Sequence, residues 1–337
     1  MEGIIGFLAV EFVKKLVIQI PCFNEAETLS IALSALPRKV GGFDIVEWLV
    51  IDDGSIDETV AVARAYGVDH VVRHARNQGL ARAFMTGLDA CLHLGADVIV
   101  NTDADNQYCA DDIPALVQPI LEQRAEIVVG ARPIETIAHF SPLKKALQKL
   151  GSWVVRFASN TDIPDAPSGF RAMSRSAAQR LMVFNDYTYT LETIIQAGQK
   201  NMAIVSVPVR VNDDLRPSRL VKSIPSYIKR SIVTIVRIFI IYRPFRFFGT
   251  IGITLFGFGF LLGLRFLWLY LEGQGSGHVQ SLILAALLMG MGFQAILIAF
   301  IADLLAANRK LTEDIRSRQI EDRVHLTGSN ISRNSDK

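Results

Sequence analysis

The chain has 337 residues and a formal net charge of +2, from 35 Lys and Arg against 33 Asp and Glu. A balance this close to neutral produces no global field that would favour nucleic acid as a partner. Half of the residues are hydrophobic and the mean hydropathy is +0.30, an excess concentrated after residue 245, so membrane-embedded segments are expected there.

The first element is an apolar stretch over residues 1–13. Glu2 stands where a signal peptide would carry basic residues, and no small-residue cleavage site follows it. We therefore expect this stretch to be a short interfacial lead-in to the first domain rather than a cleaved leader.

Residues 14–211 alternate short β-branched runs with amphipathic stretches. The expected strands cover residues 15–20, 45–51, 70–72, 97–102 and 126–131. The expected helices cover residues 26–36, 57–66, 79–95 and 111–123. Alternating strands and helices with short connections predict an α/β domain in which a mostly parallel sheet is covered on both faces.

Polar clusters follow three of these strands at their carboxyl ends, where ligands bind in such sheets. PCFNE (residues 21–25) follows the first strand, DDGS (52–55) the second, and DADNQ (103–107) the fourth. Their coincidence with the strand ends predicts one site built from the three loops.

The DADNQ cluster has the spacing of a divalent-cation site. Two carboxylates on alternate residues, Asp103 and Asp105, can converge on one hard cation that also bridges substrate phosphates. A diphosphate leaving group needs that neutralisation as its bond breaks. A solvated acidic turn is the structural alternative, since the spacing alone is a weak motif.

The DDGS cluster has a structural and a functional interpretation. Asp53-Gly54 is a turn dipeptide, and Asp57 is a candidate N-cap of the next helix. Asp52 and Asp53 also stand where a ribose or a base would be held.

Residues 212–248 are polar and basic at first and then amphipathic. Lys229, Arg230 and Arg237 share one side of the expected helix, opposite an isoleucine-rich side. Basic amphipathic helices of this kind lie in the membrane interface, although an ordinary helix packed on the domain has the same pattern.

The region over residues 249–307 contains two apolar segments, residues 250–271 and 279–302. Each is long enough to cross a bilayer. Only a short loop without Lys or Arg separates them, so we expect a transmembrane hairpin. Basic residues flank its outer ends: Arg237, Arg243, Arg246, Arg309, Lys310, Arg316 and Arg318. The positive-inside rule therefore puts both ends, the large domain and the charged tail over 308–337 in the cytoplasm.

Within the hairpin, Gly259 and Gly263 stand four residues apart, a spacing that permits close helix packing and leaves homo-oligomers possible. Arg265 lies inside the first span. It either snorkels to the interface or contacts a lipid headgroup or partner subunit.

Five motifs occur in order: PCFNE, DDGSIDET, NQGLARAFMTG, DADNQ and SGFRA. Together they resemble the family 2 glycosyltransferases, in the branch of dolichyl-phosphate mannose synthase and the bacterial polyprenyl-phosphate glycosyltransferases. The resemblance covers residues 15–220, and the two-span tail is similar to that of membrane-bound members. It implies a Rossmann-like GT-A fold, an inverting mechanism and Mg²⁺ or Mn²⁺.

The resemblance also implies roles for individual residues. The residues implied to bind the nucleotide-sugar are Pro21, Phe23, Asn24, Glu25, Asp52, Asp53, Asp103 and Gln107. The metal would be bound by Asp103, Asp105 and Gln107, and catalysis would depend on Asp105 and Arg132. The residues implied to bind the acceptor phosphate are Lys144, Lys145, Arg171, Arg216, Ser218 and Arg219. Relatives often carry an RGESK-like loop, which this chain replaces by Arg216-Pro217-Ser218-Arg219.

The expected reaction moves a sugar from a UDP- or GDP-sugar to polyprenyl phosphate (undecaprenyl or dolichyl), giving a polyprenyl-monophosphate sugar for cell-surface glycans. A lipid phosphate is largely ionised near neutral pH and attacks without a strong base, so positioning and charge stabilisation would suffice. A bacterial inner membrane, with the catalytic domain cytoplasmic, is the expected location.

Three other functions fit less well. A polysaccharide synthase with a glycan acceptor would carry a QxxRW-type motif and more membrane spans. A dehydrogenase would have GxGxxG after its first strand. A non-catalytic membrane scaffold of the same fold would have no reason to keep metal-spaced carboxylates.

Overall fold

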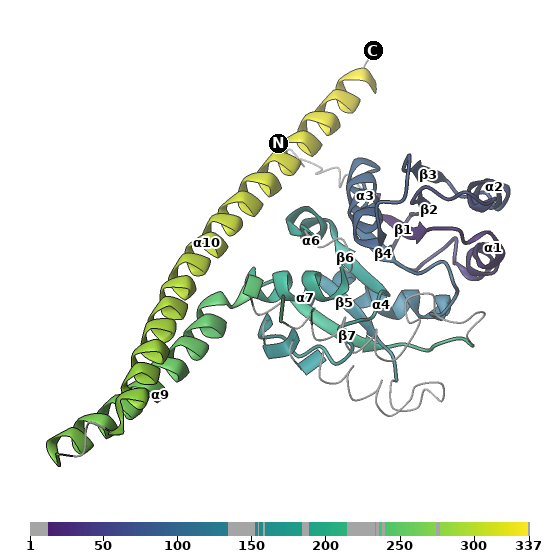
Figure 1. Cartoon of the computed structure of the whole chain (residues 1–337). Coiled ribbons are helices and arrows are strands. Elements are labelled where there is room, and N and C mark those ends of the chain that lie inside the picture. Colours follow the sequence, from purple (N-terminus) through teal and green to yellow (C-terminus); the bar gives the residue numbers. More distant parts are fainter. Residues whose placement is uncertain are drawn as a thin grey trace, which may run out of the picture. The chain divides into compact units, whose positions relative to one another are not determined.

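The computed structural model describes residues 13–133, 152–153, 155–157, 159–183, 189–213, 233, 236–237, 240–273 and 277–335 (Figure 1). The chain divides into two compact units. One comprises residues 1–220 with 317–337, and the other comprises residues 221–316. Each is described by itself.

The first unit is built on a seven-stranded sheet in the order β3-β2-β1-β4-β6-β5-β7. Its strands are β1 (Lys15–Cys22), β2 (Ile45–Asp52), β3 (His70–Arg73), β4 (Val98–Asn101), β5 (Ile127–Ala131), β6 (Arg171–Ser174) and β7 (Ile204–Pro208). All neighbours pair in parallel except β6, which runs antiparallel to both β4 and β5. The mostly parallel sheet predicted from the sequence is confirmed.

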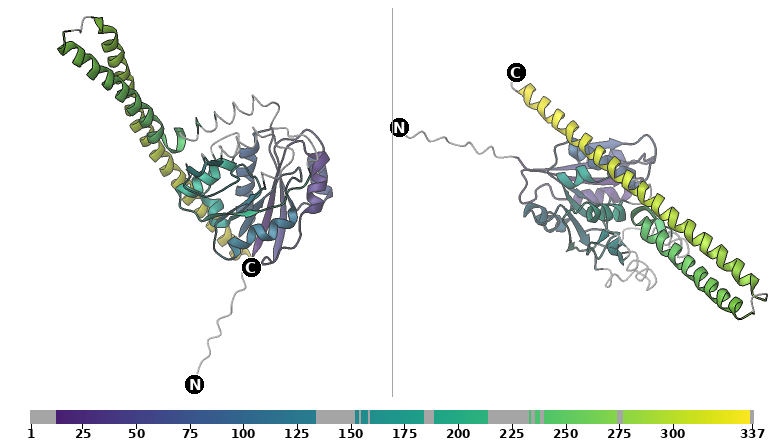
Figure 2. Two further views of the ribbon diagram at one scale, coloured as in Figure 1. Left: turned by 90° about the horizontal axis from the view of Figure 1, so that it is seen from below. Right: turned by 90° about the vertical axis from the view of Figure 1, so that its left-hand side faces the viewer.

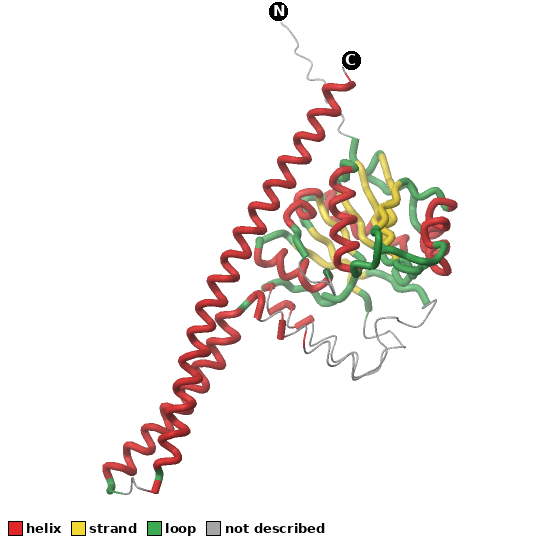
Figure 3. The backbone as a smooth tube through the Cα atoms, turned by 45° about the horizontal axis from the view of Figure 1, so that its top comes forward, coloured by secondary structure: helices red, strands yellow, loops and turns green. Residues whose placement is uncertain are grey.

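Helices cover both faces of this sheet (Figures 2 and 3). They are α1 (Ala26–Ala35), α2 (Thr59–Ala65), α3 (Leu80–His93), the 3₁₀ turn η1 (Ala110–Asp112), α4 (Ile113–Leu121), α6 (Arg175–Arg180) and α7 (Thr190–Gln199). The turn back from the edge strand β3 to β4 carries α3 to the face opposite α1 and α2, as right-handed crossovers require.

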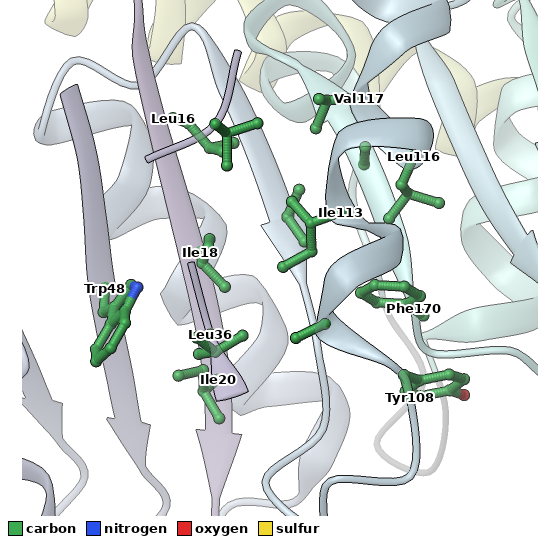
Figure 4. Packing of buried hydrophobic residues seen from close by; sticks show 14 of the residues in the cluster. Leu16, Ile18, Ile20, Leu36, Trp48, Tyr108, Ile113, Leu116, Val117 and Phe170 are labelled. Carbon is green, nitrogen blue, oxygen red and sulfur yellow. The ribbon is translucent and has the colours of Figure 1, made fainter. Parts of the chain in front are cut away.

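One hydrophobic core lies on the face of α1 and α4. Leu16, Ile18 and Ile20 of β1 are fully buried in the same cluster as Ile113 of α4 (Figure 4). Leu29 of α1 is also fully buried in this cluster. Side chains of alternate residues point to opposite faces of a strand, so Gln19 points to the α3 side, where Gly87 leaves room for its amide. This polar residue inside a hydrophobic strand is the first sign of a network that leads to the site.

The five strands and four helices expected over residues 15–131 are all present. The structure also contains β6 and β7, which are four and five residues long and are not among the five strands expected over residues 15–131. Their hydrophobic runs are too short for periodicity to separate them from loops. The antiparallel β6 matters for function, because it carries the SGFR turn back toward β4.

The second unit contains helix α9 (Pro244–Leu271) and the part of helix α10 (Val279–Ser335) up to residue 316. Residues 244–271 and 279–312 are long and apolar enough to cross a membrane. The helices pack against each other, because an added Cβ on Gly252 would lie 2.8 Å from the carbonyl oxygen of Gly292, and one on Gly259 would lie 2.8 Å from that of Ala285. This antiparallel pairing agrees with the predicted hairpin.

The contact between these helices corrects one expectation. Gly259 lies in it, but an added Cβ on Gly263 meets nothing within 4 Å. The partner of Gly259 in the seam is Gly252, seven residues before it. A spacing of seven returns a residue to nearly the same helix face, whereas a spacing of four turns it by about 40°.

Substitutions at Gly259 and Gly263 should therefore have different effects on the melting temperature. Gly259→Leu should lower the melting temperature in detergent, because the larger side chain forces the helix backbones apart at a cost of about 1–3 kcal/mol. Gly263→Leu is the matched control and should melt like the wild type. Equal melting temperatures for the two variants would contradict the observed seam.

Candidate active site

Strand register brings the three polar clusters to one edge of the sheet. Cys22 of β1 pairs with Asp52 of β2, and Gln19 of β1 pairs with Asn101 of β4. The loops that follow these strands therefore start side by side, as the sequence predicts.

The loops after β1 and β2 hold each other in place. The backbone N–H of Asn24 donates to Ser55 Oγ at 2.9 Å, and the Asn24 side-chain oxygen accepts from the N–H of Ile56 at 2.9 Å. The N–H of Glu25 donates to Thr59 Oγ1 at 2.9 Å. Asn24 has a φ of 54°, a left-handed conformation that asparagine tolerates better than most residues. These bonds fix the shape of the loop that presents Phe23, which is 40% exposed.

Asp52 is fully buried at the end of β2. One of its oxygens accepts the N–H of Ser55 at 3.0 Å. The other lies 3.0 Å from Nε of Arg73, in an orientation that makes no hydrogen bond. Asp52 thus keeps one buried acceptor without a hydrogen bond, next to a largely exposed arginine.

The Asp53 carboxylate makes internal hydrogen bonds, and the nucleoside contact expected of it stays a prediction. Its carboxylate is 3% exposed and bonds to His74 Nδ1 at 2.7 Å. It also accepts the backbone N–H groups of Gln78 and Gly79 at 2.9 and 2.8 Å. Because all three partners belong to residues 74–79, Asp53 shapes the NQG loop before α3.

Asp103 and Asp105 follow β4 and are both half-buried. Burial and the Asp105 carboxylate raise the pKa of Asp103 to about 7, against the opposing charge of Arg132. Asp105 accepts the N–H of Gln107 at 3.2 Å, which closes the turn. A carboxylate pair in which Asp105 disfavours the charge of Asp103 is a donor set that a divalent cation would stabilise.

Among the described residues, no group of three or more His, Cys, Asp or Glu side chains could hold a metal ion. The two carboxylates and the amide of Gln107 fit a hard cation that takes its remaining ligands from water and phosphate oxygens. They do not form the closed set of a structural metal site.

A network of buried polar side chains lies next to Asp103. It comprises Gln19, Asn101 and Tyr189, and we call it the polar platform. The Asn101 amide donates to the carbonyl oxygen of Gly169 at 2.8 Å and to the Tyr189 hydroxyl at 2.9 Å. Gln19 donates to the Asn101 side-chain oxygen at 2.9 Å. The Tyr189 ring stacks on Phe84, with ring centroids 3.9 Å apart. Every member of this network has a partner, so the platform is rigid where it meets Asp103.

Arg132 is held beside the same turn. Its Nε and Nη2 donate to the two oxygens of Asp165 at 2.7 and 3.0 Å, and its backbone N–H donates to Asp165 as well. Burial alone would lower the pKa of Arg132, but the negative charge and hydrogen bonds of Asp165 help to raise it. The guanidinium therefore stays charged and keeps one orientation, and its charge interacts with that of Asp103.

Arg171 does not reach the position predicted for it. It is fully buried and donates to the carbonyl oxygens of Ser168 and Ala166, both at 2.8 Å, and to Thr193 Oγ1. Burial lowers its pKa to about 10. With these internal partners, Arg171 organises the 165–171 turn.

The remaining predicted acceptor residues, Lys144, Lys145, Arg216, Ser218 and Arg219, lie outside the described residues. So do most of the 1–13 lead-in and the first part of the basic segment over 212–248. Their assignments stay predictions.

Sequence reasoning missed four residues that build the site: Asn101, Tyr108, Asp165 and Tyr189. Asn101 is the only one with a local signal, as a polar residue at the end of an apolar strand. The Tyr108 hydroxyl accepts the N–H of Gly169 at 2.9 Å across 61 residues of sequence. No local pattern predicts a contact of that separation.

Comparison with known proteins shows the family to which this chain belongs. The family model described as glycosyl transferase family 2 matches residues 17–182. The UDP-N-acetylglucosamine–dolichyl-phosphate N-acetylglucosaminyltransferase of Methanococcus voltae is 30% identical over 213 residues, which are 57% of this chain and 83% of that relative. The chain belongs to glycosyl transferase family 2.

Two further relatives of this glycosyltransferase are 26% identical to it. The polyprenol monophosphomannose synthase of Mycolicibacterium smegmatis is matched over 56% of this chain and 74% of that relative. The undecaprenyl-phosphate mannosyltransferase of Micrococcus luteus is matched over 56% and 80%. The branch predicted from the five motifs is confirmed.

Solved structures show the same fold. Glucosyl-3-phosphoglycerate synthase from Mycobacterium tuberculosis in complex with UDP has a TM-score of 0.51 at 21% identity, covering 66% of this chain and 80% of that one. Its complex with Mn²⁺, UDP and phosphoglyceric acid has a TM-score of 0.50 at 19% identity, covering 66% and 78%. The predicted GT-A fold of this glycosyltransferase is thereby confirmed.

The raised pKa of Asp103 predicts how metal binding depends on pH. Below about pH 7 the metal-free carboxyl is neutral and must lose a proton to bind a cation, so affinity should fall about tenfold per pH unit. Above that pH the affinity should level off. Titration calorimetry of Mn²⁺ with nucleoside diphosphate between pH 5.5 and 8.5 would measure this, and a flat profile would contradict it.

Proposed function

We propose that this glycosyltransferase moves a sugar from a UDP- or GDP-sugar to a polyprenyl phosphate with inversion at the anomeric carbon. The observation that carries the proposal is the Asp103–Asp105 pair, mounted on a rigid polar platform beside the fixed cation of Arg132. Relatives named as dolichyl-, polyprenol- and undecaprenyl-phosphate sugar transferases support the acceptor class.

The donor diphosphate would lie over the DADNQ turn. Asp103, Asp105 and Gln107 would hold Mg²⁺ or Mn²⁺, which when bound offsets the charge that develops on the leaving diphosphate. The structural neighbour crystallised with Mn²⁺ and UDP supports this choice of ligand. Phe23 and Asp52, with the loop that Asn24 shapes, would hold the nucleoside.

The reaction needs little proton transfer. An oxygen of the lipid phosphate forms the bond to the anomeric carbon while the bond to the diphosphate breaks, and the nucleoside diphosphate leaves. Arg132, kept charged by Asp165, would stabilise the negative charge that gathers on the phosphates. The residues proposed to bind the acceptor phosphate remain Lys144, Lys145, Arg216, Ser218 and Arg219.

The membrane arrangement follows from the charges around the two apolar helices. Basic residues lie before α9 and after the apolar part of α10, and the connecting loop has none. We therefore place the catalytic domain in the cytoplasm, with the polyprenyl phosphate presented at the inner leaflet. The product would be a polyprenyl-monophosphate sugar for glycan synthesis or modification at the cell surface.

The test is transfer of radiolabelled sugar from a panel of UDP- and GDP-sugars into polyprenyl phosphate, with Mg²⁺ or Mn²⁺. We expect label in the lipid phase with one donor and its loss with EDTA. Phosphatase-resistant label extractable into organic solvent and released by mild acid would identify the glycosyl phosphate bond. Label only in a polymeric, non-lipid product would support a glycan acceptor instead.

A further inference from the structure

Residues 210–212 follow β7 and contact the turn over residues 105–108, which carries the proposed metal-binding residues Asp105 and Gln107. Tyr108 and Val211 form an isolated antiparallel bridge, and the N–H of Cys109 donates to the carbonyl oxygen of Arg210 at 3.2 Å. The turn that carries Asp105 is thus supported on a second side, away from β4.

Asn212 makes the most direct contact in this segment. Its backbone N–H donates to the carbonyl oxygen of Gln107 at 2.9 Å. Its side-chain amide donates to the carbonyl oxygens of Asn106 at 2.9 Å and Tyr108 at 3.3 Å. One residue therefore binds three successive carbonyl groups, and only the NH₂ end of its amide can face two acceptors at once.

These bonds act where the turn needs support. Asn106 has a φ of 56°, in the left-handed region, which costs free energy unless the surroundings hold it. The reversal at Asn106 sets the direction of Gln107 relative to Asp105. A residue that binds the carbonyls on both sides of Gln107 fixes that direction.

We propose that Asn212 is a positioning residue that holds the Asp105–Gln107 turn in its metal-binding shape. This inference rests on the proposed function of that turn. In this role Asn212 acts only through the turn that it holds. Its loss should weaken metal binding because the free turn must first be ordered, and the deficit should disappear at saturating metal.

The test compares Asn212→Ala with Arg210→Ala in the full-length enzyme, measuring transfer rate against Mn²⁺ concentration. Asn212→Ala keeps the backbone bond and loses both side-chain bonds. We expect a five- to tenfold higher Mn²⁺ requirement, with near-normal rates at saturation, from hydrogen bonds of ordinary strength. Arg210→Ala, two residues before Asn212, removes the ion pairs of its guanidinium with Asp112 and Asp111 and should behave like the wild type.

A second variant guards against a general loss of stability. Asn212→Asp keeps the shape but points a carboxylate oxygen at two carbonyl oxygens, so it should raise the Mn²⁺ requirement at least as far as Asn212→Ala. An unchanged Mn²⁺ requirement in both variants would overturn the inference, as would a loss of rate that excess Mn²⁺ does not restore. Absence of Mn²⁺-dependent transfer in the wild type would instead count against the proposed function.

Discussion

Replacing Asp105 by Ala should lower kcat for sugar transfer about 10²- to 10³-fold, the usual cost of removing one preorganised electrostatic partner of a developing charge. Asp105 accepts only a long bond from the N–H of Gln107 within the described protein, so its carboxylate is available to a cation. Without it, the cation would be held by Asp103 and Gln107 alone. Steady-state transfer with purified enzyme in detergent, at saturating donor and lipid, would measure the loss.

Asp111 provides a matched control for that variant. It is an acidic residue six positions further along the chain, in η1, and its side chain is 80% exposed. Asp111→Ala should keep at least half of the wild-type rate, because an exposed charge at this distance is screened by solvent. Comparable losses in Asp105→Ala and Asp111→Ala would assign the effect to the general charge of the loop and contradict a metal site at Asp105.

Gly169→Ala should reduce transfer at least tenfold while the enzyme still folds. A Cβ at this position would lie 2.9 Å from the Tyr189 hydroxyl and 3.1 Å from both oxygens of Asp103. Tyr189 is held by Asn101 and by its stacking on Phe84, so it cannot retreat. The Asp103 carboxylate must therefore move, and it would move out of line with Asp105.

The physical cost of that methyl group is about 1–3 kcal/mol of overpacking, which lowers stability but does not abolish folding. Gly41→Ala is the matched control, because an added Cβ there meets nothing within 4 Å. Thermal melting with and without Mn²⁺ and nucleoside diphosphate should show that Gly169→Ala loses most of the ligand-induced stabilisation. Retention of wild-type stabilisation and rate would show that Asp103 is not confined by the SGFR turn.

The order of elements and the location of the site were predictable from local patterns. The apolar runs that end at Cys22, Asp52 and Asn101 alternate with amphipathic helices, and this alternation is sufficient to predict a parallel sheet. Since the carboxyl ends of parallel strands share an edge, the three polar loops had to meet. Apolar length and flanking charge likewise predicted the two candidate membrane helices.

The roles of individual residues within the site depended on contacts between distant segments. Asp53 and Arg171 have the side-chain chemistry of ligand-binding residues. Both are nevertheless buried, and both make hydrogen bonds to other residues of the protein. Asn101 reaches Gly169 across 68 residues, and Asn212 reaches Asn106 across 106. Local sequence does not record such partners, because it specifies only the periodicity and the turn chemistry of each segment.

The same division holds in the membrane unit. Sequence determined that two helices long and apolar enough to cross a bilayer stand next to each other, since hydropathy and length are properties of each segment alone. Which glycine lies in the seam, Gly259 and not Gly263, was decided by the rotation of α9 against α10. In both units the sequence determined which chemical groups are present and near which strand or helix end, and the tertiary structure decided which of them remain available. Burial and hydrogen-bond partners come from packing, and packing joins residues that are far apart in the chain.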